Sequence, residues 1–225
     1  MLHYTKQMPA QKDIIDQTVD FVQQQLKNAE AGHDWFHIER VWKMAKHIAA
    51  KETASQLIVE LGALLHDIAD SKFHNGDETI GPRLAREFLA GQQAGEATIG
   101  AVENIIRNIS FKGSYQPAQY RTIELDIVQD ADRLDALGAI GIARAFNYGG
   151  FKNRKLYDPA IKPAQYTTKE QYKNNDAPTI NHFYEKLFLL KDKMNTETGK
   201  RIAEDRHRFM QQFIEQFYRE WNSLD

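Results

Sequence analysis

The chain has 225 residues, of which 42% are hydrophobic and 27% charged, enough for the apolar core of one large domain or two small ones. A formal net charge of −2 argues against a protein that binds polymeric nucleic acid through bulk positive charge. The absence of cysteine excludes disulfides and thiolate zinc sites, which fits a reducing compartment. The polar first 30 residues and the lack of any long apolar run predict no signal peptide and no membrane span, hence a soluble, cytoplasmic protein.

Four helices are expected in the N-terminal part of the chain, because apolar side chains recur there at helical spacing. Asp34 is well placed to cap the second helix and Ser55 the third, and Pro82 suits the first turn of the fourth. A polar stretch over 71–78 indicates a loop before the fourth helix. The expected helical segments are 14–26, 36–48, 58–65 and 82–91.

The middle of the chain continues in the same pattern. A further helix is expected over 96–109, followed by a loop over 115–120. Residues 122–147 then resemble one long or bent helix. Gly138 and Gly141 weaken that helix or permit close packing against a neighbour.

The chain changes character after residue 147. Residues 148–178 contain Gly149-Gly150 and three prolines, which predicts a long irregular insertion, and such loops are usually functional. With Tyr148 it could form a lid over a base or sugar, although an ordinary long loop also explains it. Helices are expected over 180–194 and 198–221, and the second carries an apolar stripe that suits a core or a dimer contact: Ile202, Phe209, Met210, Phe213, Ile214, Phe217 and Trp221.

These elements predict an all-α protein, since no strand-like alternation is long enough to matter. We expect a single domain over 1–225. Its core would span about 30–147, with an insertion or lid at 148–178 and C-terminal helices at 179–225.

Three separated stretches carry residues that suit a metal ion. Asp67 follows His66 inside the apolar run 61–70, and a buried carboxylate is costly unless it is paired or bound to a metal. His37 lies upstream and Asp132 downstream. Imidazoles and carboxylates together suit a divalent ion of borderline hardness. His66 and Asp67 diverge by about 100° around a helix, yet both could reach one ion lying over it. Buried His–Asp hydrogen bonds are the alternative explanation.

His37, His66-Asp67 and Asp132 resemble the defining ligands of the HD-domain superfamily of metal-dependent phosphohydrolases. The resemblance implies an HD-domain helical bundle with extra C-terminal helices, but no particular substrate. It covers nearly the whole chain and is similar to a stand-alone bacterial branch associated with nucleotide pyrophosphohydrolysis. The matching stretches are 32–41, 65–73, 130–141 and 182–187.

Two ligand assignments have competitors nearby. His33 competes with His37, and the resemblance favours His37, three residues before Arg40. Asp130 competes with Asp132, and the resemblance favours Asp132 because it directly precedes a basic residue. The residues not chosen would orient a ligand or a water molecule.

The chemistry around such an ion needs a proton-transfer group and cations for phosphates. Asp70 lies three residues after Asp67 on nearly the same helical face, and the resemblance implies that an acidic group there activates water, with Asp67 as its catalytic neighbour. Aspartate is shorter than the glutamate of some relatives, and an idle, exposed carboxylate is the alternative. Four basic side chains are candidates for the substrate phosphates, although each could be a solvated surface charge: Lys72, His74, Lys112 and Arg133.

The resemblance therefore implies a phosphohydrolase with a small nucleotide substrate, plausibly a nucleoside triphosphate cut to monophosphate and pyrophosphate. A 5′-nucleotidase or alarmone hydrolase would keep the same site. A non-catalytic nucleotide-binding module is a third reading, favoured only by Asp70 in place of glutamate. The expected cofactor is one divalent ion, manganese first, then iron, nickel, cobalt or zinc, with magnesium disfavoured by two imidazoles. Neither a membrane nor polymeric nucleic acid is an expected partner, and a homodimer is possible.

Overall fold

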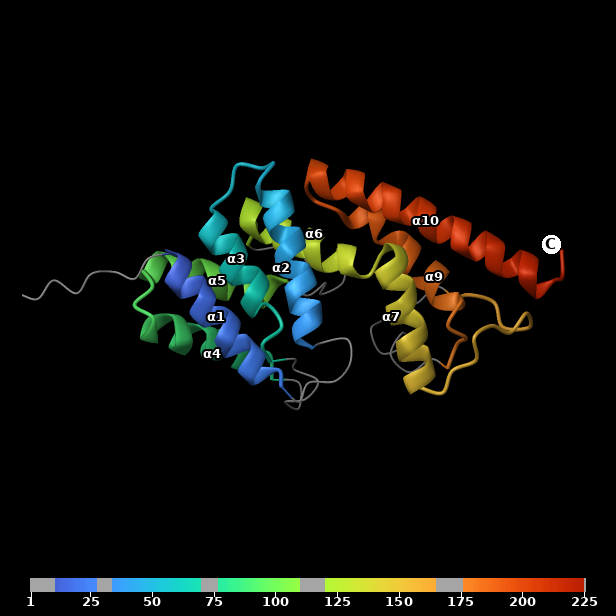
Figure 1. Cartoon of the computed structure of the whole chain (residues 1–225), viewed down its shortest axis with the longest axis horizontal. Helices are drawn as coiled ribbons and strands as arrows, with labels where there is room; N and C mark the ends of the chain where they lie inside the picture. The colour runs from blue at the N-terminus through green and yellow to red at the C-terminus, as the bar shows by residue number, and fades with distance from the viewer. Residues whose placement is uncertain (1–10, 28–33, 70–76, 110–119, 165–175, 225) are drawn as a thin grey trace, which may run out of the picture. The chain divides into compact units, whose positions relative to one another are not determined.

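The computed structural model describes residues 11–27, 34–69, 77–109, 120–164 and 176–224, and within them every regular element is a helix (Figure 1). The prediction of an all-α protein is confirmed. The α-helices are α1 (Gln11–Gln25), α2 (Trp35–Ala49), α3 (Gln56–Leu65), α4 (Ile80–Gly91), α5 (Glu96–Asn108), α6 (Ile123–Asp135), α7 (Gly138–Phe151), α9 (Asn181–Glu185) and α10 (Glu197–Trp221), with 3-10 helices η2 (Leu187–Leu189) and η3 (Lys191–Lys193).

The chain folds into two compact units, Met1–Val128 and Gln129–Asp225, and α6 begins in the first and ends in the second. The expectation of one domain over 1–225 stays a prediction. None of the helices in the described ranges combines the length and the apolar character needed to cross a bilayer.

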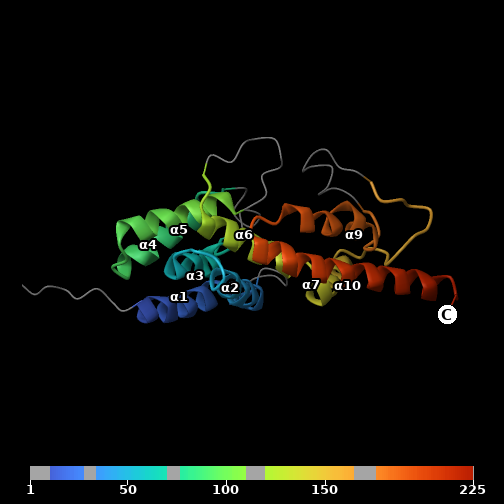
Figure 2. The same ribbon diagram turned by 90° about the horizontal axis from the view of Figure 1, so that it is seen from above.

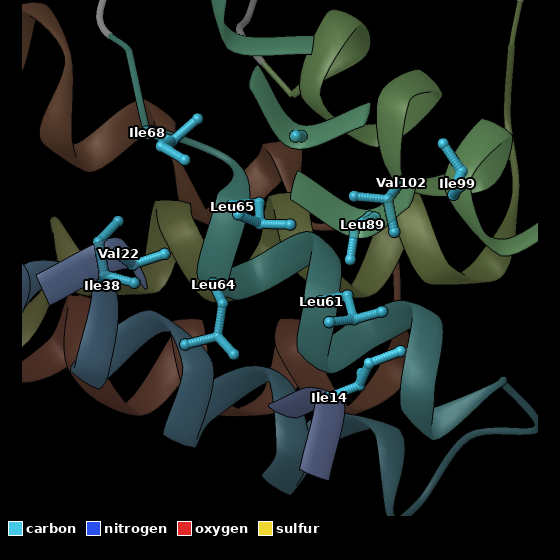
Figure 3. Packing of buried hydrophobic residues seen from close by; sticks show 11 residues of the cluster. Ile14, Val22, Ile38, Leu61, Leu64, Leu65, Ile68, Leu89, Ile99 and Val102 are labelled. Carbon is cyan, nitrogen blue, oxygen red and sulfur yellow. The ribbon is translucent and has the colours of Figure 1, made fainter. Parts of the chain in front are cut away.

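The central helix of the first unit is α3, which packs against α1, α2 and α5, while α4 packs on α5 (Figure 1, Figure 2). A helix enclosed on several sides must be apolar nearly all round, as its sequence QLIVELGALL is. Leu61, Leu64 and Leu65 have no exposed surface and lie in an aliphatic cluster with residues of the surrounding helices (Figure 3). Burying each of them contributes roughly 1.5–3 kcal/mol relative to exposure.

The ends of these helices test the predicted caps. Asp34 caps α2, because its Oδ1 accepts a 2.9 Å hydrogen bond from the backbone N–H of His37. Ser55 precedes α3 as predicted, but its side chain makes no capping bond; its own N–H donates to Glu124 Oε1 at 3.0 Å. Pro82 lies in the first turn of α4, as expected.

Residues 122–147, expected to form one long or bent helix, form two separate helices, because the chain turns between α6 and α7. Leu137 is extended and Gly138 has φ of +73°, a left-handed conformation that favours glycine. A Cβ on Gly138 would also lie 3.1 Å from Arg206 Cγ. Helix α7 then continues to Phe151, into the segment expected to be irregular.

The second unit is built on α10, which packs against α7 and η3. Aromatic rings pack against one another in this unit. The buried Phe183 stacks on Phe213 at a centroid distance of 5.9 Å, and Tyr157 meets Trp221, which is about half exposed, edge-on at 5.0 Å. Of the predicted apolar stripe on α10, Met210 and Ile214 are buried, which confirms its core part. A dimer contact there stays a prediction.

The helix predicted over 180–194 is wrong as a continuous element. The chain forms α9, η2 and η3 in succession, and Lys186 leaves the helical region at φ −143° and ψ −55°. The buried hydrophobic residues of this stretch recur every three, four or seven positions, which short 3-10 turns satisfy as well as an α-helix. They are Ile180, Phe183, Leu187 and Met194.

Candidate metal centre

Two histidines come together in the first unit. His37 lies in the first turn of α2, where the Asp34 cap fixes the backbone, and His66 directly follows α3. They are 2% and 7% exposed, and their ring centroids are 5.4 Å apart at an interplanar angle of 70°. Their neighbours Ile38 and Leu65 belong to the aliphatic cluster (Figure 3), so packing holds the helices that position both rings.

The hydrogen bond of His66 determines which of its nitrogens carries the proton. Nδ1 of His66 lies 2.8 Å from the carbonyl oxygen of Ala63. A carbonyl only accepts, so Nδ1 carries the proton and Nε2 keeps its lone pair. This is the arrangement that orients a metal-binding imidazole.

Asp132 reaches the same place along α6. Val128 packs against α3, since its Cγ2 would lie 3.5 Å from a Cβ on Gly62. His66 lies four residues after Gly62, and Asp132 lies four residues after Val128, which is about one helical turn in each case. Helix α6 is unbroken between Val128 and Asp132.

His37, His66 and Asp132 each offer one ligand atom, and these atoms lie within 4.8 Å of one another. Donors about 2.0–2.2 Å from one ion are at most about 4.4 Å apart, so small side-chain rotations would close them around an ion. Two imidazoles and one carboxylate therefore fit a divalent transition metal in both spacing and chemistry.

Comparison with known proteins agrees with this arrangement. The family model described as HD domain matches residues 35–137, from α2 to the end of α6. A crystal structure of an HD-superfamily hydrolase from Bacillus thuringiensis is 45% identical, with 95% of this chain and 99% of that chain covered and a TM-score of 0.77. The chain belongs to the HD-domain superfamily.

Other relatives of this HD-domain protein extend over similar lengths. The uncharacterized protein YpgQ of Bacillus subtilis is 37% identical over 93% of this chain and 95% of its own. A crystal structure of YpgQ in complex with ADP has a TM-score of 0.75, with 93% of this chain and 96% of that chain covered. A predicted HD-superfamily hydrolase from an uncultured Thermotogales bacterium is 25% identical with a TM-score of 0.62, covering 92% of each chain.

Asp130, the rejected ligand candidate, has a different role in the HD-domain protein. It is fully buried, and its Oδ1 accepts from the N–H of Asn195 at 2.8 Å and its Oδ2 from the N–H and hydroxyl of Thr196, both at 2.8 Å. A Cβ on Gly199 would lie 2.4 Å from Oδ2, so only glycine fits there. Asp130 thus anchors the start of α10. Burial raises its pKa, and the donors of Thr196 and Asn195 oppose that rise.

Sequence reasoning did not find this anchor, since the partners of Asp130 lie 65 and 66 residues further along the chain. The local signal was Thr196 followed three residues later by Gly199, whose N–H donates to the Thr196 hydroxyl at 2.9 Å.

The remaining predicted site residues fall into two groups. Asp67 is half-buried in the turn after α3 and is not a member of the three-residue group; its roles as fourth ligand and in catalysis stay predictions. Arg133 donates to the Lys193 carbonyl and lies 3.7 Å from the Asp130 carboxylate, and its substrate role stays a prediction. The others lie outside the described residues: His33, Asp70, Lys72, His74 and Lys112.

Proposed function

We propose that the protein is a metal-dependent phosphohydrolase of nucleotides, which cleaves a nucleoside triphosphate to the monophosphate and pyrophosphate. The observation that carries the proposal is the group formed by the buried His37 and His66 and the half-buried Asp132, whose ligand atoms lie within 4.8 Å of one another. Membership of the HD-domain superfamily, with hydrolases among its close relatives, supports the reaction class. The complex of YpgQ with ADP supports a nucleotide as substrate.

The residues that would hold the ion are His37, His66 and Asp132, with Asp67 as the fourth ligand. Two imidazoles with carboxylates favour manganese, with iron, nickel, cobalt, zinc and magnesium as alternatives. A divalent ion bound there supplies Lewis acidity toward a phosphoryl oxygen and lowers the pKa of a bound water molecule.

The chain's own groups would complete the reaction. The Nδ1–H bond to the Ala63 carbonyl keeps the His66 ring in one orientation and one tautomer. Asp67 and Asp70 would orient the attacking water and accept its proton. Lys72, His74, Lys112 and Arg133 would bind the phosphates, which they neutralise as the leaving group departs.

The test is a panel of nucleoside mono-, di- and triphosphates and guanosine tetraphosphate, assayed with manganese, cobalt, nickel and magnesium, with products resolved by chromatography. We expect pyrophosphate from triphosphates. Released phosphate from monophosphates would instead assign a nucleotidase, and pyrophosphate from a guanosine tetraphosphate an alarmone hydrolase. Binding without turnover under every ion would assign a non-catalytic module.

Substitutions separate the metal centre from the rest of the fold. Asp132→Asn and His37→Ala should lose bound metal and lower turnover about a thousandfold or more, because several kcal/mol of transition-state stabilisation are lost. The matched controls are Asp126→Asn on α6 and His47→Ala, which is exposed on α2. Undiminished turnover and metal content in Asp132→Asn would end the proposal.

A further inference from the structure

The second half of α6 is attached along one face to the residues that precede α10. Gln129, Asp130 and Arg133 lie within four positions of one another, so their side chains fall within about 100° around the helix. All three are bonded to the stretch 193–196 of the second unit. The candidate ligand Asp132 belongs to the same turn of α6 but lies on a different face.

Asp130 is at the centre of this attachment. Its carboxylate is fully buried and accepts the backbone N–H groups of Asn195 and Thr196 and the Thr196 hydroxyl, each at 2.8 Å. The Thr196 hydroxyl also accepts from the N–H of Gly199 at 2.9 Å and thereby caps α10. One hydroxyl group therefore joins the start of α10 to α6.

Asn195 and Arg133 add further bonds along the same face. The side-chain amide Nδ2 of Asn195 donates to Asp130 Oδ1 and to Gln129 Oε1, both at 3.1 Å. The Arg133 guanidinium donates to the Lys193 carbonyl and, at 3.2 Å, to Gln129 Oε1. Because these bonds are spread over a full turn of α6, they oppose both a rotation of the helix about its axis and a shift along it.

The rotation of α6 decides where the carboxylate of Asp132 lies. The Cα atoms of an α-helix lie about 2.3 Å from its axis, so a rotation of about 15° moves each Cα by about 0.6 Å and the tip of a side chain further. A functional side chain has to be held to within about 0.5 Å of its productive position. A small rotation of α6 would therefore be enough to remove the ligand atom of Asp132 from the group that it forms with His37 and His66.

We propose that Asn195 and Thr196 are positioning residues of the metal centre: they hold Asp130, and through it they set the rotation of α6 that presents Asp132 to the ion. The inference rests on the proposed metal-dependent function and deepens it, because it adds two residues from a distant part of the chain to the same centre. Groups that orient metal ligands typically change metal affinity about 10–100-fold when they are removed.

Calorimetric titration of the full chain with manganese chloride tests the inference. Thr196→Val keeps the shape of the side chain but loses its hydroxyl, and it should weaken manganese binding about tenfold. Thr196→Ser restores the hydroxyl and should bind manganese within about twofold of the wild type. Asn195→Ala keeps the backbone donor and loses only the side-chain amide, so it should weaken binding by about fivefold. It replaces Thr196→Val if circular dichroism shows that the latter is not folded.

Ile214→Val is the matched control for a general loss of stability. Ile214 is 4% exposed and lies further along α10, so shortening it should lower the midpoint of urea unfolding without removing a bond of Asp130. Its manganese affinity should change less than about twofold.

Turnover separates positioning from a defect in folding. At saturating manganese, Thr196→Val should regain most of the wild-type kcat for a nucleoside triphosphate with an unchanged KM, because bound ion holds Asp132 in place. A merely structural defect would instead lower kcat at every manganese concentration, since fewer molecules are folded.

A double substitution tests whether Thr196 acts through Asp130. In an Asp130→Asn background the acceptor of the Thr196 hydroxyl is already altered, so adding Thr196→Val should weaken manganese binding less than about twofold further. Independent effects would instead multiply.

Three results would overturn the inference. One is wild-type manganese affinity in both Thr196→Val and Asn195→Ala. Another is equal weakening by Ile214→Val, which would reduce the effect to stability. The third is a full additional loss from Thr196→Val in the Asp130→Asn background. A wild type that binds no divalent ion is a distinguishable result, because it contradicts the metal centre of the proposed function and, with it, this inference.

Discussion

The two units are stabilised by different interactions. In the first unit, aliphatic side chains enclose α3, and its leucines have no exposed surface. In the second, aromatic rings meet edge-on or stacked, and one buried carboxylate, Asp130, binds the start of α10 with both oxygens. Aliphatic packing spreads its stabilisation over many weak contacts, whereas a buried ionic anchor concentrates it in a few strong ones. Single substitutions should therefore affect the two units in different ways.

The largest effect on stability is expected at the anchor. Asp130→Ala removes the acceptor of four hydrogen bonds from Asn195 and Thr196, and it leaves the backbone N–H groups of both residues without this acceptor. Leaving a buried group unpaired this way should cost about 3–5 kcal/mol of unfolding free energy. Urea denaturation measures the loss. The matched change Asp205→Ala, which removes an exposed carboxylate paired with the exposed Arg208 on α10, should cost less than about 1 kcal/mol.

A core substitution in the first unit should cost somewhat less. Leu64→Ala leaves a cavity where the side chain has no exposed surface, so we expect a loss of about 3 kcal/mol. Leu57→Ala, on the same helix but only partly buried, is the control and should lose about half as much or less. Equal losses at both positions would contradict the view that α3 is the enclosed centre of the unit.

Acid should weaken the second unit through His182. Its pKa falls from 6.5 to about 3 on folding, chiefly by burial, so the unfolded chain binds a proton that the folded chain does not. The folded state is therefore favoured most above pH 6.5, where His182 is neutral in both states, and this advantage is lost as the pH falls toward 3. Between pH 6.5 and 5 the loss should be about 1.5 kcal/mol. Urea denaturation at both pH values measures this loss of unfolding free energy. The variant His182→Gln cannot titrate, so its unfolding free energy should depend less on pH. An unchanged pH dependence in this variant would show that another group is responsible.

The smallest effect is expected at the cap of α2. Asp34→Ala removes the 2.9 Å bond to the His37 N–H and should cost about 1 kcal/mol. Because this cap sets the turn that carries His37, metal affinity should fall along with stability. Asp34→Asn, which keeps a capping oxygen, should restore most of both. A loss of stability with unchanged metal affinity would show that the cap does not position the histidine.

The sequence predicted what local patterns encode. The helical spacing of apolar residues and the capping residue types were enough to predict α1 to α5 and the Asp34 cap. The family resemblance selected His37, His66 and Asp132. The corner at Gly138 was missed because a helical pattern on both sides of a glycine does not reveal the sign of its φ. The short helices after Ile180 were missed because the spacing of the apolar residues in this stretch suits one continuous α-helix as well as short 3-10 turns.

The anchor at Asp130 could not be found from the sequence, for a different reason. Its partners come from a distant part of the chain, and nothing in the local pattern distinguishes Asp130 from Asp132 as the buried structural carboxylate. The structural carboxylate and the candidate ligand lie two positions apart on α6, and only tertiary packing distinguishes their roles.

Successive residues of a helix are rotated by about 100°, so Asp130 and Asp132 point to faces of α6 about 160° apart. Inserting or deleting one residue between Asp130 and Asp132 would change this angle, so that the two carboxylates could no longer face both sets of partners. Length variation in this turn should therefore be absent from functional variants, whereas the exposed residues 222–224 after α10 should accept it readily.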